Sequence, residues 1–350
     1  MEKTYELMEE LTQIVGISGD EKQVSKALAK HYEGLCDEIV YDNLGSIFAV
    51  KKCGKANAKK VMVCAHMDEV GFMITEIQKN GLLSFIKIGP VNEAAIYGSR
   101  VTLKTRENQE IDGVIVADEE TAEHTEIKKM KIDLGCRSKE EVVALGVMVG
   151  DRCVLSGPFT KLQDRIVSKA WDNRFGCVLG IELLEQLKDV QLDYDLYIGA
   201  SVMEEVGQRG ATTATGLIHP DMGMILDCSN ANDYAGKENE VGQLGKGVLV
   251  RYYDKGMMPN RGLLDELVRV CKENEIDHQY FYNMETTDSA WIHKLFSGCP
   301  TLSVCVCARG VHTQSSILDL HDYACAKEAA FHVLSELTEE KIEAFKASNR

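Results

Sequence analysis

The sequence lacks the features that mark secreted, membrane-spanning and nucleic-acid-binding proteins. Its start, Met1 to Glu6, has neither a basic segment nor an apolar core, so no signal peptide is expected. No apolar run approaches the roughly 18 residues needed to cross a membrane. Basic residues are scarce, with 39 Lys and Arg against 55 Asp and Glu, and the formal net charge is −16. This charge repels phosphate backbones and anionic lipids, so neither nucleic acid nor a membrane is expected as a partner.

The sequence also lacks the cysteine pairs of common zinc sites. It has 12 Cys, but none of them form a C-x-x-C motif, which disfavours a cysteine-ligated zinc. Most lie in apolar, strand-like contexts, as Cys64, Cys305 and Cys307 do. Free, buried thiols in a reducing compartment explain them best, so the sequence predicts a cytoplasmic protein.

Length and patterning predict two structural units. With 350 residues, the chain is long enough for one large domain and a smaller one. Residues 1–70 and 163–350 alternate strand and helix patterns, which predicts an α/β fold with a mixed sheet flanked by helices. Residues 71–162 show short strands and turns instead, as in the hairpin of Phe72–Ile77 and Leu82–Ile88. We therefore predict a discontinuous large domain, 1–70 and 163–350, with an inserted β-rich domain, 71–162.

Local signals predict where several helices begin. Ser18 with Glu21, and Ser138 with Glu141, have the spacing of capping boxes. Asp172 precedes a helix over 175–187 and could simply cap it, because Asp is a favoured N-cap residue. A carboxylate has two oxygens, however, so Asp172 could also bridge two cations.

Five short polar clusters follow predicted strands or open predicted helices, which is where ligands bind in open α/β sheets. They contain His66 with Asp68, Asp172, Glu204 with Glu205, Asp227, and His312. Each cluster alone has an ordinary structural explanation, such as a polar loop. Together, two His and at least three carboxylates match the nitrogen and oxygen coordination of zinc or a similar ion. Their order, His, Asp, Glu, Asp, His, suits two metal ions that share one carboxylate.

The clusters resemble those of metallopeptidase family 42, the glutamyl and deblocking aminopeptidases of the tetrahedral type. The resemblance extends over nearly the whole chain. It rests on the strings Ala65–Phe72, Asp172–Arg174 and Glu204–Ala211, on Thr287 with Asp288, and on Arg309 with His312. Several spaced motifs in the right order make a chance match improbable.

The resemblance implies a set of metal ligands. His66, Asp172 and Asp227 would hold one divalent ion, and Asp172, Glu205 and His312 would hold the other, with Asp172 bridging. The ions would be zinc, or cobalt or manganese in its place.

The resemblance also implies a mechanism, an activity and an assembly. Glu204 would be the general base for a hydroxide between the metals, and Asp68 would orient His66. The activity would be removal of the N-terminal residue from short peptides. The fold would be a zinc-peptidase-like catalytic domain with an inserted PDZ-like dimerisation domain. Dimers would assemble into a homo-oligomeric dodecamer.

Three features depart from the family pattern. Gly310 to Gln314 stand where Tyr-Ile-His-Ser-Pro is usual, and Asn283 to Thr286 stand where a glycine-rich stretch usually precedes Thr287 and Asp288. Trp171 occupies a position where a smaller residue is common. All the implied ligands are kept, so these departures bear on the substrate pocket and not on the chemistry.

Three other functions fit part of the pattern. A related metal hydrolase could act on N-acyl amino acids or C-terminal residues. A glycosidase would use paired carboxylates, but Glu204 and Glu205 are neighbours that cannot easily flank a sugar bond, and Trp occurs only twice. A non-catalytic metal-binding assembly protein would not need Glu204. Chelator sensitivity and the response to an acetylated N-terminus separate these alternatives.

Overall fold

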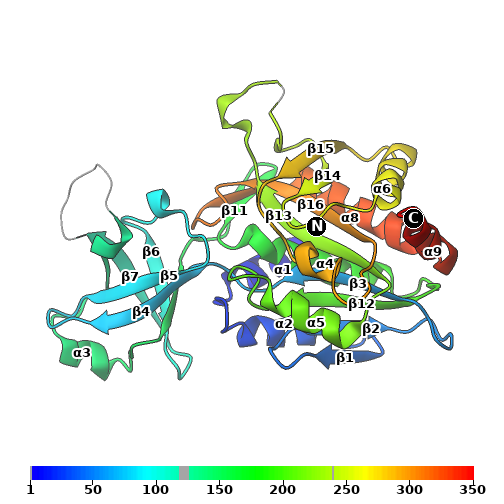
Figure 1. The fold of residues 1–350 in the computed structure, drawn as a ribbon. Coiled ribbons are helices and arrows are strands. Elements are labelled where there is room, and N and C mark those ends of the chain that lie inside the picture. The colour runs from blue at the N-terminus through cyan, green and yellow to red at the C-terminus, as the bar shows by residue number, and fades with distance from the viewer. Residues whose placement is uncertain (1, 118–125, 239) are drawn as a thin grey trace.

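The computed structural model describes residues 2–117, 126–238 and 240–350. Met1, residues 118–125 and residue 239 lie outside this description, although the predicted domain ranges include them. The described residues form a large mixed sheet covered by helices, with a closed barrel beside it (Figure 1). The predicted α/β class, with a mixed sheet flanked by helices, is confirmed.

The large sheet has 11 strands, nine of which form one continuous order. In spatial order these are β1 (Glu38–Tyr41), β2 (Ile47–Lys51), β12 (Asp195–Ser201), β3 (Lys60–His66), β13 (Met222–Asn230), β16 (Thr301–Arg309), β17 (Ser316–Asp319), β11 (Arg165–Ser168) and β10 (Thr160–Leu162). The other two are β14 (Val248–Asp254), which pairs with β16, and β15 (His278–Asn283), which pairs with β14. At the centre, β12, β3, β13 and β16 run parallel, so their carboxyl ends meet at one edge.

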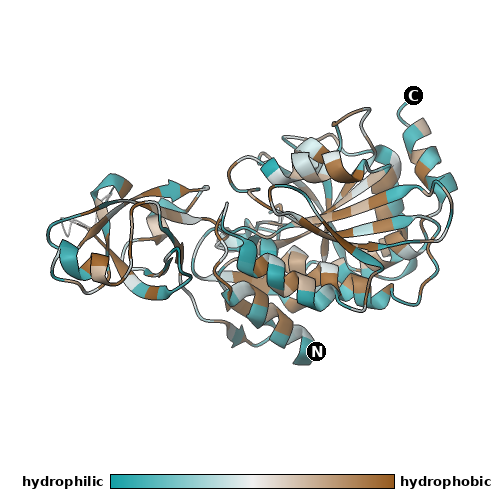
Figure 2. Ribbon diagram, turned by 90° about the horizontal axis from the view of Figure 1, so that it is seen from below, coloured by the Kyte–Doolittle hydropathy of each residue, from teal (hydrophilic) through white to brown (hydrophobic). Residues whose placement is uncertain are grey.

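Helices cover both faces of this sheet. One face carries α1 (Glu2–Gln13), α2 (Lys22–Tyr32), α4 (Trp171–Gln186), α6 (Arg261–Glu273), α8 (Leu320–Ser335) and α9 (Glu339–Ala347). The other face carries α5 (Arg209–Ile218) and α7 (Ser289–Ile292). Alternate side chains of β3 point to the two faces, since Val61 and Val63 pack with the first group whereas Met62 and Cys64 pack with the second. Burial on both faces explains why the central strands are predominantly hydrophobic along their length (Figure 2).

The segment between β3 and β10 forms the barrel. Its strands close in the order β4 (Gly71–Ile77), β5 (Leu83–Ile88), β8 (Met130–Asp133), β7 (Glu110–Ala117), β6 (Arg100–Lys104) and β9 (Arg152–Leu155). One short helix, α3 (Lys139–Ala144), begins where expected, because the Ser138 hydroxyl accepts a hydrogen bond from the Glu141 amide. The barrel has its own apolar core, which includes Phe72 and Phe85. The predicted β-rich unit is present, whereas its PDZ-like character and the exact domain boundaries stay predictions.

The sequence misplaced several elements. The capping box at Ser18 and Glu21 does not form: α2 begins at Lys22, and neither side chain caps it. The short strands β10, β11 and β17 were missed because pairing with distant strands, and not a long apolar run, stabilises them. The sequence pattern over 289–296 also predicts a helix, but α7 ends at Ile292, and Phe296 has a positive φ of 56°.

All 12 cysteines are free thiols, and nine of them are buried, as the sequence predicted for most of them. Within the described ranges, no helix is both long and apolar enough to cross a membrane.

Candidate metal and catalytic site

The predicted site residues converge at the carboxyl edge of the central strands. His66 is the last residue of β3 and lies beside Ser201, the last residue of β12. Asp227 lies on the adjacent strand β13, two residues beyond Ile225, which pairs with Cys64. Glu204 and Glu205 follow β12 in a turn, where the Gly207 and Gln208 amides both donate to the Glu204 carbonyl. This turn directs both carboxylates to the site.

Asp172 does not cap the helix that follows it. Asp172 and Asn173 have non-helical backbone angles at the start of α4. The Asn173 side chain takes the capping role, because its Oδ1 accepts from the Gly176 amide at 3.0 Å and its Nδ2 donates to the Leu226 carbonyl at 2.8 Å. Asp172 is thus free to point away from the helix, toward the two histidines.

His312 is held in a loop after β16. It has a positive φ of 61°, and its carbonyl accepts from the Asn92 amide at 3.4 Å. Arg309, which the resemblance singled out, lies outside the cavity and fixes this loop: its guanidinium pairs with both oxygens of Asp233 at 2.7 and 2.8 Å. Arg309 therefore supports His312 at a distance and does not contact the centre of the site.

The two oxygens of Asp172 face different histidines. Oδ1 lies 2.9 Å from His66 Nε2, and Oδ2 lies 3.1 Å from His312 Nε2. His66 Nε2 is also 3.8 Å from Asp227 Oδ1, and His312 Nε2 is 3.2 Å from Glu205 Oε1. Each group, His66 with Asp172 and Asp227, and Asp172 with Glu205 and His312, offers three ligand atoms within 4.8 Å of one another. The structure thus brings together all five predicted ligands, although their role as ligands stays a prediction.

Crowding of buried charge perturbs every one of these groups. Burial raises the pKa of Asp227 well above its usual value, and the nearby Asp172 raises it further. Burial also raises the pKa of Glu205. The pKa of Asp172 is lowered instead, because contacts with His312 and His66 outweigh its burial. Burial would lower the pKa of His312, but Glu205 and Asp172 raise it to about 11. The site therefore favours positive charge between its carboxylates.

The donor set fits divalent cations. Glu205 Oε1 and His312 Nε2 are buried and lie at ion-pair distance from each other, yet neither forms a hydrogen bond with a described residue. Buried polar atoms are nearly always partnered, so two such atoms facing each other indicate a place for a cation. Imidazole nitrogens and carboxylate oxygens are the ligands that zinc, cobalt and manganese accept.

A further set of contacts, centred on Asp68, holds the residues that line the site. Asp68 is fully buried, and its Oδ1 lies 3.4 Å from His66 Nδ1. Its carboxylate accepts from the Glu204 and Glu205 amides at 2.9 and 3.1 Å, and from the Ser18 hydroxyl at 2.6 Å. One side chain therefore contacts a histidine and anchors the turn that carries both glutamates, as the predicted orienting role of Asp68 requires. Ser18 was read as a helix cap, and its role here could not be inferred from local sequence.

Asp288 and Thr287, which the resemblance also singled out, lie behind the site. Asp288 Oδ2 accepts a short hydrogen bond from the Ser201 hydroxyl, at 2.5 Å. Burial raises the pKa of Asp288 to about 6. Thr287 donates to Asp254 Oδ2 at 3.2 Å, which anchors one wall of the cavity.

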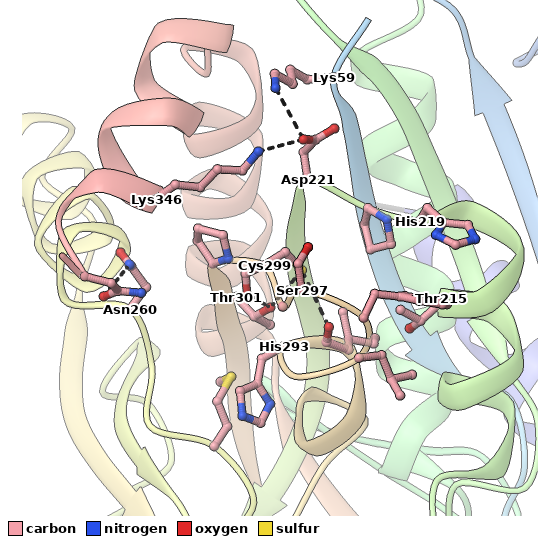
Figure 3. A pocket seen from close by; sticks show the side chains of 18 of the residues that line it. Lys59, Thr215, His219, Asp221, Asn260, His293, Ser297, Cys299, Thr301 and Lys346 are labelled. Carbon is pink, nitrogen blue, oxygen red and sulfur yellow. Dashed lines mark hydrogen bonds and ion pairs between the residues drawn. The ribbon is translucent and has the colours of Figure 1, made fainter. Parts of the chain in front are cut away.

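The site opens into a cavity of about 330 Å³, whose wall includes Pro90 from the barrel side and Asn283 to Thr286. A larger cavity, of about 670 Å³, lies at the amino ends of β13 and β16, on the opposite edge of the sheet. There, Lys59 and Lys346 point to Asp221 and form ion pairs with it (Figure 3). The two lysines of the larger cavity already have an acidic partner, and ligands of open α/β sheets bind at the carboxyl ends of the strands. We therefore assign the chemistry to the smaller cavity.

Several known aminopeptidases match this chain. The model of the M42 glutamyl aminopeptidase family matches residues 45–328. The glutamyl aminopeptidase of Lactococcus lactis is 32% identical over 97% of this chain and 98% of its own. The TET aminopeptidase of a marine sediment thaumarchaeote is 31% identical with a TM-score of 0.93, covering 99% of this chain and 100% of its own. The TET1 peptidase of Pyrococcus horikoshii, which can assemble into a tetrahedron or a large octahedral shell, is 27% identical with a TM-score of 0.86, covering 95% and 100%.

Proposed function

The chain belongs to the M42 glutamyl aminopeptidase family and is an aminopeptidase, and from this premise we propose that it removes N-terminal residues from short peptides with two divalent metal ions and Glu204 as general base. The observation that carries the proposal is Asp172, whose two oxygens face two histidines 2.9 and 3.1 Å away. A carboxylate in this position suits two ions that share one ligand.

The family implies divalent metal ions, and the residues present would divide them as follows. His66, Asp172 and Asp227 would hold one ion, and Asp172, Glu205 and His312 the other. Zinc fits these ligands, and so do cobalt and manganese. When bound, such ions make water acidic enough to act as a nucleophile near neutral pH and stabilise negative charge on a carbonyl oxygen.

Glu204 would move the proton. Its carboxylate is buried, and Oε2 lies 4.0 Å from His66 Nε2, at the edge of the ligand cluster. Burial raises the pKa of Glu204 well above its usual value, with Asp288 and Glu205 adding to the effect against His66. A carboxylate with a raised pKa takes a proton from the attacking water more readily and can return it to the leaving amine. The acidic wall of the cavity suits the free α-amine of a peptide, which supports exopeptidase action.

The proposal extends to assembly and location. The P. horikoshii TET1 peptidase can assemble into a tetrahedron or a large octahedral shell. We propose that this chain also forms a large homo-oligomer, in which dimers build a dodecamer and the barrel is a PDZ-like dimerisation domain. We also propose a cytoplasmic location, because 12 free thiols suit a reducing compartment.

Glu204→Gln tests the proposed base. The variant should bind metal ions like the wild type, while kcat on aminoacyl p-nitroanilides should fall roughly 10²–10⁴-fold, because a general base contributes about that factor. The wild type should also cleave a short peptide with a free N-terminus but not the same peptide once that N-terminus is acetylated. Wild-type turnover by Glu204→Gln would show that the base is misassigned. Equal cleavage of the acetylated peptide would favour a hydrolase of N-acyl amino acids.

A further inference from the structure

Glu204 is not the only side chain that the turn after β12 brings to the cavity. The Gln208 amide donates to the Glu204 carbonyl at 2.9 Å, which closes the turn and brings residues 204 and 208 close together. Gln208 Nε2 donates to Glu204 Oε1 at 3.0 Å. Among the residues that the structure describes, this is the one hydrogen bond shown to the Glu204 carboxylate. It engages Oε1 and leaves Oε2 on the side of His66.

The same amide nitrogen has a second acceptor. Gln208 Nε2 also lies 2.9 Å from Thr286 Oγ1, across the cavity mouth. A side-chain amide has two N–H groups, so both are used, one by the carboxylate and one by the hydroxyl. A general base acts in its ionised form, and an ionised carboxylate can only accept, so the amide nitrogen and not the amide oxygen faces Glu204.

Thr286 is itself held in place. Its neighbour Thr287 is buried and bonds to Asp254 and to Ser289 Oγ, at 3.2 and 2.7 Å. Asp254 is paired in turn with the buried Arg251 at 2.9 Å. Gln208 therefore links the Glu204 carboxylate to Thr286 on a fixed wall of the cavity. A glycine at position 286 would offer no hydroxyl, so the bridge depends on the segment in which this chain departs from the family pattern.

We propose that Gln208 is a positioning residue for Glu204: with Thr286 as its anchor, it holds Oε1 so that Oε2 faces the reacting water. The inference rests on the proposed role of Glu204. A general base acts only when it lies within hydrogen-bond reach of the proton it removes, so loss of the bridge should slow the proton transfer more than it weakens substrate binding.

The test compares Gln208→Met, Thr286→Val and Thr286→Ser in the metal-loaded full-length protein. Gln208→Met keeps side-chain length without donors, and kcat should fall roughly 10- to 100-fold with KM changed less than about 2-fold, as expected for loss of a hydrogen bond to a charged group. Thr286→Val should lower kcat by roughly 2- to 10-fold, because it removes a neutral hydrogen bond. Thr286→Ser keeps the hydroxyl and should therefore have the kcat of the wild type. Metal content and the visible spectrum of the Co²⁺-loaded protein should match the wild type.

The control is Gln78→Met, since the Gln78 amide also donates to a hydroxyl, Ser84 Oγ at 3.1 Å, but in the barrel. Its kinetics should be those of the wild type. Wild-type kcat in Gln208→Met, an effect on KM alone, or loss of metal would overturn the positioning role. Glu204→Gln, measured alongside, keeps the two ideas apart: if it retains wild-type turnover, the base itself is wrong, whatever Gln208 does.

Discussion

At the scale of single residues, the site depends on which way one carboxylate points. Asp172 stands at the start of a helix, where its residue type would ordinarily act as a cap. Asn173 takes that role through the Gly176 amide, and Asp172 turns to His66 and His312. Of these two neighbouring residues, Asn173 thus caps the helix and Asp172 faces the site.

Asp172→Asn should therefore disable both halves of the site. The amide keeps the shape but loses the charge that would compensate the two proposed cations, so we expect metal content to drop and kcat to fall by at least roughly 10²-fold. Elemental analysis after dialysis measures the metal directly. A chelator should lower the melting temperature of the wild type, because bound ligand stabilises the folded state, but not that of the variant.

The matched control is Asp112→Asn, on an exposed part of β7 where the Asp112 carboxylate accepts from the Thr102 hydroxyl at 3.3 Å. It should keep its metal and its chelator response. If Asp172→Asn also retained a full metal complement, the shared-ligand arrangement would have to be abandoned.

At the scale of elements, the loop between α1 and α2 connects the barrel to the site. Arg152 of β9 donates to the Gly19 carbonyl at 2.7 Å, and Lys104 of β6 lies 3.3 Å from Asp20. On its other side the loop contributes Ser18 to Asp68 and Glu21 to the Met203 amide, at 2.6 and 3.0 Å. The barrel is therefore part of the support of the turn that carries both glutamates.

The first turn of α8 carries a buried carboxyl group outside the site. Asp322 accepts from the Gly245 and Gly247 amides at 2.8 and 2.6 Å, which lowers its pKa, but burial has the larger effect and raises it to about 6. In the unfolded chain the pKa returns to about 3.8. Over this interval the folded state binds the proton more tightly, so the contribution of Asp322 to stability falls as pH rises from about 4 to about 6.

Asp322→Asn should remove this dependence. The free energy of unfolding of the variant minus that of the wild type should increase with pH over that window, by at most roughly 3 kcal/mol, since one pKa unit corresponds to about 1.4 kcal/mol. Urea unfolding at several pH values measures the difference. A flat difference for Asp322→Asn would contradict the raised pKa.

At the scale of the whole molecule, the barrel lies to one side of the large sheet (Figure 1). Much of the barrel therefore faces away from the rest of the described chain. A closed barrel has no free strand edges, so any partner would meet its side chains and not its backbone. This arrangement suits a unit that makes contacts between subunits.

We expect the full-length protein to be a dodecamer of its 38.9 kDa chain. Light scattering coupled to size exclusion gives the mass without reference to shape. A tetrahedral particle should also be visible by electron microscopy. A monomer at micromolar concentration would contradict the proposed assembly while leaving the proposed chemistry of the site intact.

The sequence by itself determined the parts whose signals are local. The hydrophobic runs around Lys60–Cys64 and Leu302–Cys307 predicted buried strands, and the polar residues that follow such strands predicted a site at their carboxyl ends. The order of histidines and acids then pointed to a pair of cations. The strands and the place of the site were predicted correctly because strand ends in parallel sheets meet at one edge whatever the loops between them do, whereas the pair of cations stays a prediction.

Only the tertiary structure decided the parts that depend on distant contacts. Ser18 has the spacing of a helix cap but donates to Asp68, 50 residues away, and Gln208 reads as an ordinary loop residue until Thr286 lies beside it. The short strands β10, β11 and β17 exist only through each other and β16. A hydrogen bond between remote segments leaves no periodicity in either, so no local pattern could have predicted these contacts.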